Sequence, residues 1–191
     1  SFPTRRSSDL VVNSVVLEPF LLINTNENML AFANGQPIPH IINNIFVPTF
    51  GMVGGTGSTI SLLIAIFIFS RQKSAKQVAR LSLAPGLFNI NEPVIFGLPI
   101  VFNLPLMIPF VLLPAIGIYF AWLCTTLGLM SRCVVMIPWT TPPILSAWLA
   151  TAGDWRAVVV QLAIIVFGVF FYLPFLKIAE RVALKNSGIE N

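Results

Sequence analysis

Residues 88–93, which read Phe-Asn-Ile-Asn-Glu-Pro, include a single carboxylate, Glu92, in a long stretch without other charges. No other Asp, Glu, Lys or Arg occurs between Leu81 and Ser131. A charged group at the centre of a bilayer costs about 3 kcal/mol on insertion scales, so an ionisable residue in an apolar segment is by default a functional candidate. We therefore interpret Glu92 as a functional carboxylate. The alternative is a structural acid that satisfies the N–H groups at a helix end.

The composition around this carboxylate is that of a membrane protein. Charged residues make up 9% of the chain and apolar residues 56%, whereas an ordinary soluble domain has about 25% charged residues. The mean hydropathy is +0.86. Windows without Asp, Glu, Lys or Arg cover residues 28–70, 93–131, 133–153 and 157–176, and about 20 mainly apolar residues cross a bilayer. The sequence therefore predicts an all-α polytopic membrane protein with room for three or four crossings.

The charges at the ends of these windows predict the topology. Residues 71–80 carry four basic side chains and no acid, and short basic loops of this kind face the cytoplasm. The mainly basic tail after residue 176 indicates the same side. The simplest count between these two points is two crossings, one within residues 104–130 and one over residues 157–176. The apolar run over residues 62–69 is expected to be a further span.

Two apolar segments are expected to enter the membrane without crossing it. Prolines interrupt residues 81–103 and residues 133–153, so neither segment is expected to be an uninterrupted helix. Residues 11–37 combine a short apolar run with polar, turn-rich sequence, which is typical of a re-entrant or amphipathic segment at the membrane boundary. Discontinuous segments of this kind form the substrate sites of transporters.

Five residues beside the lone carboxylate are candidates for a substrate site. We expect the amides of Asn89 and Asn91 to hold the carboxylate, or to hold a hairpin together. Trp139 and Thr140 place an aromatic face next to a hydroxyl, which suits the apolar C–H faces and polar rims of sugars. Interfacial anchoring is the alternative for this tryptophan. His40 is the only histidine. It is either a ligand contact or a structural group in a proline-rich turn.

Several kinds of chemistry are not expected. The sequence has no Gly-x-x-x-x-Gly-Lys phosphate loop, no metal-ligand cluster and no Ser/His/Asp set. Cys124 and Cys133 lie in or beside apolar runs and lack metal-ligand spacing. The net charge of +4 comes from small clusters at the window ends, so no nucleic-acid partner is expected. We expect no cofactor, and any phosphoryl group would come from another polypeptide.

Three stretches carry a resemblance to a known family: residues 81–99 (LSLAPGLFNINEPVIFGLP), 138–143 (PWTTPP) and 153–156 (GDWR). They resemble the membrane IIC subunit of the lactose/cellobiose/diacetylchitobiose group of bacterial phosphotransferase systems. The similarity extends from about Val11 to the C-terminus. It implies a homodimeric permease of ten spans in the bacterial cell membrane, of which this chain is similar to roughly the C-terminal two fifths. It also implies import of a β-linked disaccharide, which the cytoplasmic IIB partner, itself served by IIA, then phosphorylates.

The resemblance also implies roles for individual residues. In that family the Glu of Asn-Glu-Pro contacts the sugar near the hydroxyl to be phosphorylated, and Glu92 matches it. Trp139 matches a tryptophan of the sugar site. The family histidine lies in a Gly-Ile-His-Gly-like motif just before the stretch that matches residues 11–14, where this chain has Arg-Ser-Ser-Asp-Leu at residues 6–10. His40 does not match it, so we expect that the chain alone does not transport sugar.

Residues 1–10 are unlike the rest of the sequence. They are polar and resemble the translated read-through of a common sequencing adapter, with a genuine basic arm as the alternative. On this interpretation the chain is a fragment, in which residues 11–185 are the C-terminal part of the membrane domain and residues 186–191 a cytoplasmic tail. Two other functions stay open: an ion-coupled carrier that uses Glu92 as a proton relay, and a truncated assembly or regulatory subunit that binds a partner but no sugar.

Overall fold

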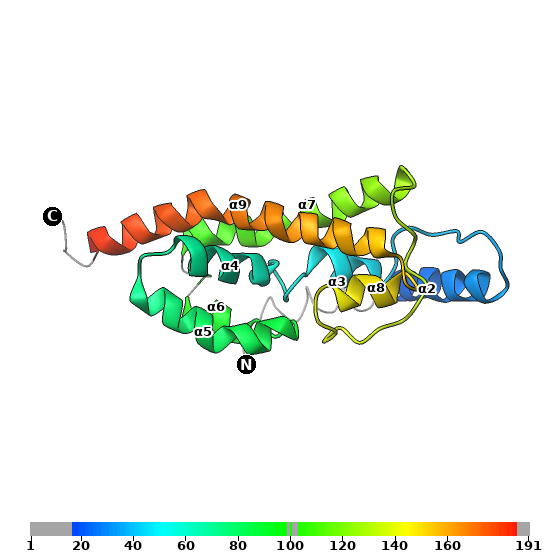
Figure 1. Cartoon of the computed structure of the whole chain (residues 1–191), viewed down its shortest axis with the longest axis horizontal. Helices are drawn as coiled ribbons and strands as arrows, with labels where there is room; N and C mark the ends of the chain where they lie inside the picture. Colours follow the sequence, from blue (N-terminus) through cyan, green and yellow to red (C-terminus); the bar gives the residue numbers. More distant parts are fainter. Residues whose placement is uncertain (1–16, 99, 101–102, 187–191) are drawn as a thin grey trace, which may run out of the picture.

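The computed structural model describes residues 17–98, 100 and 103–186, and this part of the chain is helical, without strands (Figure 1). Residues 1–10, predicted to be an adapter artefact, lie outside the described residues, as does most of the predicted tail, residues 187–191. The all-α expectation is confirmed. The helices are α2 (Glu18–Ala33), α3 (Phe46–Gly51), α4 (Thr59–Phe69), α5 (Lys73–Leu87), α6 (Glu92–Gly97), α7 (Leu104–Thr126), α8 (Leu145–Ala150) and α9 (Trp155–Asn186).

The two long helices, α7 and α9, pack against each other along the molecule (Figure 1). Among the described residues, Leu104–Thr126 and Trp155–Val182 are the helical stretches long and apolar enough to cross a membrane. They lie where hydropathy predicts spans. Gly117 of α7 lets α3 approach closely, because a Cβ atom there would lie 2.6 Å from the Phe50 carbonyl oxygen.

The prediction of a complete span over residues 62–69 is wrong, because α4 is too short. Its 11 residues correspond to about 16 Å of helix, against about 30 Å of hydrocarbon core. Helix α3 ends just before it, and the loop between them contains Gly54, Gly55 and Gly57 at φ +77°, +100° and +81°. These angles lie outside the right-handed helical region and suit glycine. Together α3, this loop and α4 form a broken helix.

The polar stretch near the N-terminus is helical rather than turn-rich as predicted. Helix α2 runs through residues 24–28, and the side chains of Asn24, Thr25 and Asn28 find backbone partners. The Asn28 amide is fully buried and donates to the carbonyl oxygens of His40 and Cys133 at 2.8 and 3.1 Å. The Thr25 hydroxyl donates to the carbonyl oxygen of Leu21 at 2.8 Å. The chain turns only afterwards, at Gly35, where φ is +66°.

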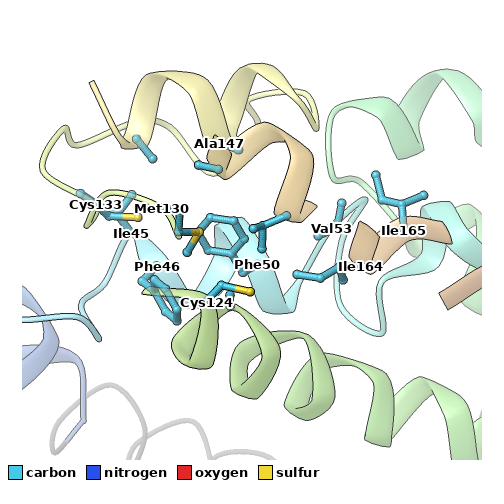
Figure 2. Packing of buried hydrophobic residues seen from close by; sticks show 14 of the residues in the cluster. Ile45, Phe46, Phe50, Val53, Cys124, Met130, Cys133, Ala147, Ile164 and Ile165 are labelled. Atoms are coloured by element: carbon cyan, nitrogen blue, oxygen red, sulfur yellow. The ribbon is translucent and has the colours of Figure 1, made fainter. Parts of the chain in front are cut away.

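Two clusters of buried apolar side chains form the core. The first surrounds α3, where the rings of Phe46 and Phe50 lie 5.1 Å apart among residues of α7, α8 and α9 such as Cys124, Ala147 and Ile164 (Figure 2). The second joins α4 to α5, α6, α7 and α9. The expected interruptions separate these helices: residues 81–103 include a turn between α5 and α6, and residues 133–144 precede the short helix α8.

Candidate functional site

A cavity of about 660 Å³ lies where the broken segments meet. Its volume falls within the range of about 300–1,000 Å³ that is typical of small-molecule sites. Of the residues predicted for the site, Asn89 and Trp139 line it, and Asn91, Glu92, Thr140 and His40 do not. The lining consists of Glu18, Asn44, Ile45, Pro48, Thr49, Val53, Asn89, Met136, Ile137, Pro138, Trp139, Pro143, Ser146 and Gln161.

Asn89 connects three broken segments. Its Nδ2 donates to the carbonyl oxygens of Trp139 and Thr141 at 2.5 and 3.0 Å, and its Oδ1 accepts the Gly54 N–H at 2.9 Å. Its own backbone has φ +62°, a conformation that asparagine tolerates better than most residues. Both amide hydrogens therefore fix the backbone on either side of Thr140 and are not free for a ligand.

Trp139 is the aromatic residue of the cavity lining. It is 65% exposed, although its backbone is held by Asn89. Thr140 follows it in the chain and is half-buried. An aromatic ring that is exposed but fixed at its backbone can stack on an apolar ligand face with little loss of freedom.

Asn91 and Glu92 differ sharply in their surroundings. The Asn91 side chain is buried, and its amide donates to the Thr56 carbonyl oxygen at 2.7 Å. Glu92 begins α6 and is exposed, and its carboxylate makes no hydrogen bond with the described residues. The expectation that Asn89 and Asn91 hold this carboxylate is therefore not met, because backbone carbonyl oxygens occupy both amides.

His40 lies away from the cavity, beside the C-terminal half of α2. Its Nε2 is 2.5 Å from Oε2 of Glu27, and its backbone N–H donates to the Asn28 side chain at 2.9 Å.

Within the described residues, no group of three or more His, Cys, Asp or Glu is placed to hold a metal ion.

Sequence reasoning missed five polar residues of the cavity: Glu18, Asn44, Thr49, Ser146 and Gln161. Gln161 is buried in α9. Its Oε1 accepts the Ile144 N–H at 2.5 Å, and its Nε2 donates to the Thr49 carbonyl oxygen and to Ser146 Oγ at 2.7 and 3.0 Å. Gln161 is the only amide in the window of residues 157–176, and a polar side chain in an apolar helix is the signal that could have found it.

This glutamine supports an unusual backbone next to the cavity. Ile144 has φ +76°, which is rare for a β-branched residue, and its N–H is held by Gln161. Conformations of this kind cost about 1–3 kcal/mol and persist where surrounding contacts enforce them. Gln161 therefore couples α9 to α3 and α8 around the cavity.

Asp154 joins the start of α9 to the loop after α7. Its Oδ1 accepts the Arg156 N–H at 2.9 Å and its Oδ2 the Ser131 N–H at 2.7 Å. Partial burial acts to raise the pKa of Asp154, but the hydrogen bonds from Arg156 and Ser131 and the Arg156 charge outweigh it, so the pKa lies below its ordinary value. This carboxylate stabilises the junction as an anion.

The fold is that of an all-helical membrane protein, and its broken segments surround a cavity of a size typical of small-molecule sites. Comparison with known proteins identifies the family. Residues 10–114, more than half of the chain, match the family model described as phosphotransferase system, EIIC. The chain belongs to this family, which confirms the resemblance seen in the sequence.

Similar proteins support the same family assignment. The chain is 43% identical over 151 residues to the cellobiose-specific EIIC component of Lactococcus lactis, covering 75% of this chain and 31% of that protein. It is 34% identical over 172 residues to the lichenan permease IIC component of Bacillus subtilis, covering 90% and 38%. The crystal structure of ChbC, the IIC component of the N,N'-diacetylchitobiose-specific system, matches with a TM-score of 0.87 and 36% identity, covering 93% and 41%. The chain thus spans about a third to two fifths of these proteins.

Proposed function

We propose that this chain is the C-terminal, sugar-binding part of a IIC permease that imports a β-linked disaccharide for phosphoenolpyruvate-dependent phosphorylation. The observation that carries the proposal is the cavity beside Trp139, in a chain of the EIIC family. Relatives named for cellobiose and for N,N'-diacetylchitobiose favour β-linked disaccharides as the substrate class. The alternative of an ion-coupled carrier has no comparable support.

In this proposal Trp139 and Glu92 have different tasks. The Trp139 indole stacks on the apolar face of a sugar ring, because the ring is exposed to the cavity while Asn89 holds its backbone. Glu92 lies outside the cavity lining but is exposed, and its carboxylate makes no hydrogen bond with the described residues, so we assign it to accept a hydrogen bond from the hydroxyl that receives the phosphoryl group. Asn89 and Asn91 position the segments around them, and a contact between Thr140 and the sugar stays a prediction. A contact between His40 and the sugar stays a prediction.

The phosphoryl group comes from cytoplasmic IIB and IIA partners, so the chain itself needs no cofactor. One contact supports a common cytoplasmic side for both basic regions: the Ser70 hydroxyl, just before α5, donates to Glu180 Oε1 of α9 at 2.5 Å. The basic segment 71–80 and the basic end of α9 therefore lie at the same end of the molecule, as the positive-inside rule requires. We propose a multi-pass protein of the bacterial cell membrane, homodimeric in its full-length form.

Equilibrium sugar binding tests this function. The full chain in lipid nanodiscs is titrated with radiolabelled cellobiose, lactose and diacetylchitobiose, with the α-linked disaccharide maltose as the control ligand. We expect saturable binding of at least one β-linked sugar and none of maltose. Folded protein that binds no β-linked disaccharide would contradict the proposal.

A matched pair of variants locates the binding. Trp139→Ala removes the proposed stacking surface and is expected to weaken binding about 10-fold, since aromatic contacts contribute about 0.5–1.5 kcal/mol beyond their buried area. Trp155→Ala is the control, because Trp155 is 63% exposed, close to the 65% of Trp139, but lies outside the cavity. Equal losses in both variants would argue against stacking in this cavity.

A further inference from the structure

We propose that Glu18 and Asn44 bind the hydroxyl groups of the sugar in this cavity. The inference rests on the proposed function and assigns two residues that the sequence patterns did not single out. Both line the cavity together with Trp139. They differ from Asn89 and Gln161 of the same lining because their side chains make no hydrogen bond with the described residues.

The other amide side chains in the lining have little capacity left for a ligand. Both hydrogens of the Asn89 amide go to backbone carbonyl oxygens, and its oxygen accepts a backbone N–H. Gln161 uses its oxygen and both of its hydrogens in the same way, on Ile144, Thr49 and Ser146. These two residues build the walls of the cavity, so a polar ligand needs other partners.

Glu18 offers an unengaged carboxylate. It is the first residue of α2, yet no side-chain hydrogen bond caps this helix, and Glu18 makes no hydrogen bond with the described residues. A carboxylate has about four acceptor sites, and hydrogen bonds to a charged group are stronger than those between neutral groups. Sugar hydroxyls supply the donors that this carboxylate lacks. The structural alternative is that Glu18 caps α2, but its side chain makes no capping hydrogen bond.

Asn44 offers the complementary donors. Its backbone is fixed, because its N–H donates to the Leu21 carbonyl oxygen and to Thr25 Oγ1 at 3.3 and 3.1 Å. Its side-chain amide makes no hydrogen bond with the described residues. The neighbouring Asn43 is fully buried and uses its side chain on Ile45, Phe46 and Cys133. Asn43 thus supports the fold, whereas the side chain of Asn44 is available to a ligand in the cavity.

The three side chains together match the chemistry of a disaccharide. Trp139 provides an apolar face, Glu18 accepts hydrogen bonds, and Asn44 both donates and accepts them. Sites built to bind hydroxyl groups discriminate strongly against ligands that lack them. The pair Glu18 and Asn44 is therefore expected to determine which hydroxyl pattern the cavity prefers.

The test measures cellobiose affinity of the full chain in nanodiscs. Glu18→Gln and Asn44→Ala are each expected to weaken binding, the first by about 10- to 100-fold and the second by about 3- to 10-fold. Matched controls outside the cavity are Glu180→Gln, which keeps an oxygen for Ser70, and Asn26→Ala on the exposed face of α2. Both controls are expected to bind as the unaltered chain does. Circular dichroism checks that each variant is folded.

The outcomes separate this inference from the proposed function. Unchanged affinity in folded Glu18→Gln and Asn44→Ala, with binding by the unaltered chain, would overturn the inference alone. Absence of binding by the unaltered chain would contradict the proposed function, and the assignment with it. If Glu18→Gln does not fold, Glu18→Asp keeps the charge but shortens its reach by one methylene, and it is still expected to bind more weakly.

Discussion

The side-chain amide of Asn89 donates a hydrogen bond to the carbonyl oxygen of Trp139 at 2.5 Å, across 50 residues of sequence. The same amide binds Thr141, and its oxygen binds Gly54. One short side chain thus joins the turn before α6, the glycine-rich break between α3 and α4, and the loop before α8. The position of the cavity's aromatic face depends on this junction.

Removing this junction is predicted to cost both stability and affinity. Asn89→Ala leaves two partly buried backbone groups and one exposed carbonyl oxygen without their partner, so we expect a loss of about 1–3 kcal/mol in unfolding free energy. Sugar binding should weaken as well, because Trp139 loses its anchor. Thermal unfolding in nanodiscs and cellobiose titration measure the two effects. Normal stability together with normal affinity in Asn89→Ala would show that the junction is dispensable.

Gln161 is predicted to be the most sensitive polar residue of α9. Gln161→Leu leaves the Thr49 carbonyl oxygen and the Ile144 N–H unpaired beside a strained residue, so we expect destabilisation of about 2–4 kcal/mol. Gln72→Leu is the control, because the Gln72 side chain makes no hydrogen bond with the described residues. Chemical unfolding of both variants provides the comparison. A control as unstable as Gln161→Leu would refute a specific role for Gln161.

The stability that Asp154 contributes is predicted to depend on pH. Its pKa is lower in the folded chain than the ordinary value of 3.8, so the unfolded chain binds the proton more tightly. The stabilisation is therefore fully present above pH 3.8 and is lost as the pH falls through the lower, folded pKa. Asp154→Ala should cost about 1 kcal/mol at neutral pH, and less once the carboxylate is protonated.

A second variant isolates the charge of this residue. Asp154→Asn keeps a capping oxygen but cannot ionise, so it should lose less stability at neutral pH than Asp154→Ala does. Its stability should also lack the pH dependence that the carboxylate contributes. Unfolding curves for the three proteins at neutral pH and near pH 3 measure this. A constant difference between the unaltered chain and Asp154→Asn across that range would contradict the shifted pKa.

Transport is predicted to need more sequence than this chain supplies. The chain spans 31% of the cellobiose-specific EIIC component of Lactococcus lactis. We expect no cellobiose uptake when it is expressed alone in a host that lacks its own permease. A chimera that joins the upstream part of the Lactococcus protein to residues 11–191 should restore uptake that depends on phosphoenolpyruvate and IIB. Uptake by the chain alone would disprove this prediction.

The same chimera tests Glu92. Glu92→Gln keeps the size of the side chain but removes its charge, and we expect uptake with phosphorylation to fall at least about 10-fold, the loss of one charged hydrogen bond. Glu180→Gln serves as the charge-matched control. Normal uptake by the Glu92→Gln chimera would remove Glu92 from the proposed mechanism.

The sequence predicts the long helices better than the site. Hydropathy alone places α7 and α9, and the prolines place the broken segments, because both signals act locally. Within the helical residues 24–28, Asn28 is bonded to Cys133, 105 residues away, and no local pattern reveals such a contact. The glycines at residues 54, 55 and 57 are the sequence signal that a helix break precedes α4 and leaves it short. Glu18 and Asn44 were missed because only the folded chain brings them beside Trp139.

The most direct measurement of where the sugar binds is photo-crosslinking. A diazirine derivative of cellobiose is bound to the full chain, activated by light, and its attachment sites are found by mass spectrometry. We expect labels on Glu18, Asn44 and residues 136–143, all suppressed by excess cellobiose. Labels that cellobiose suppresses but that lie only outside this cavity would show that the sugar binds elsewhere.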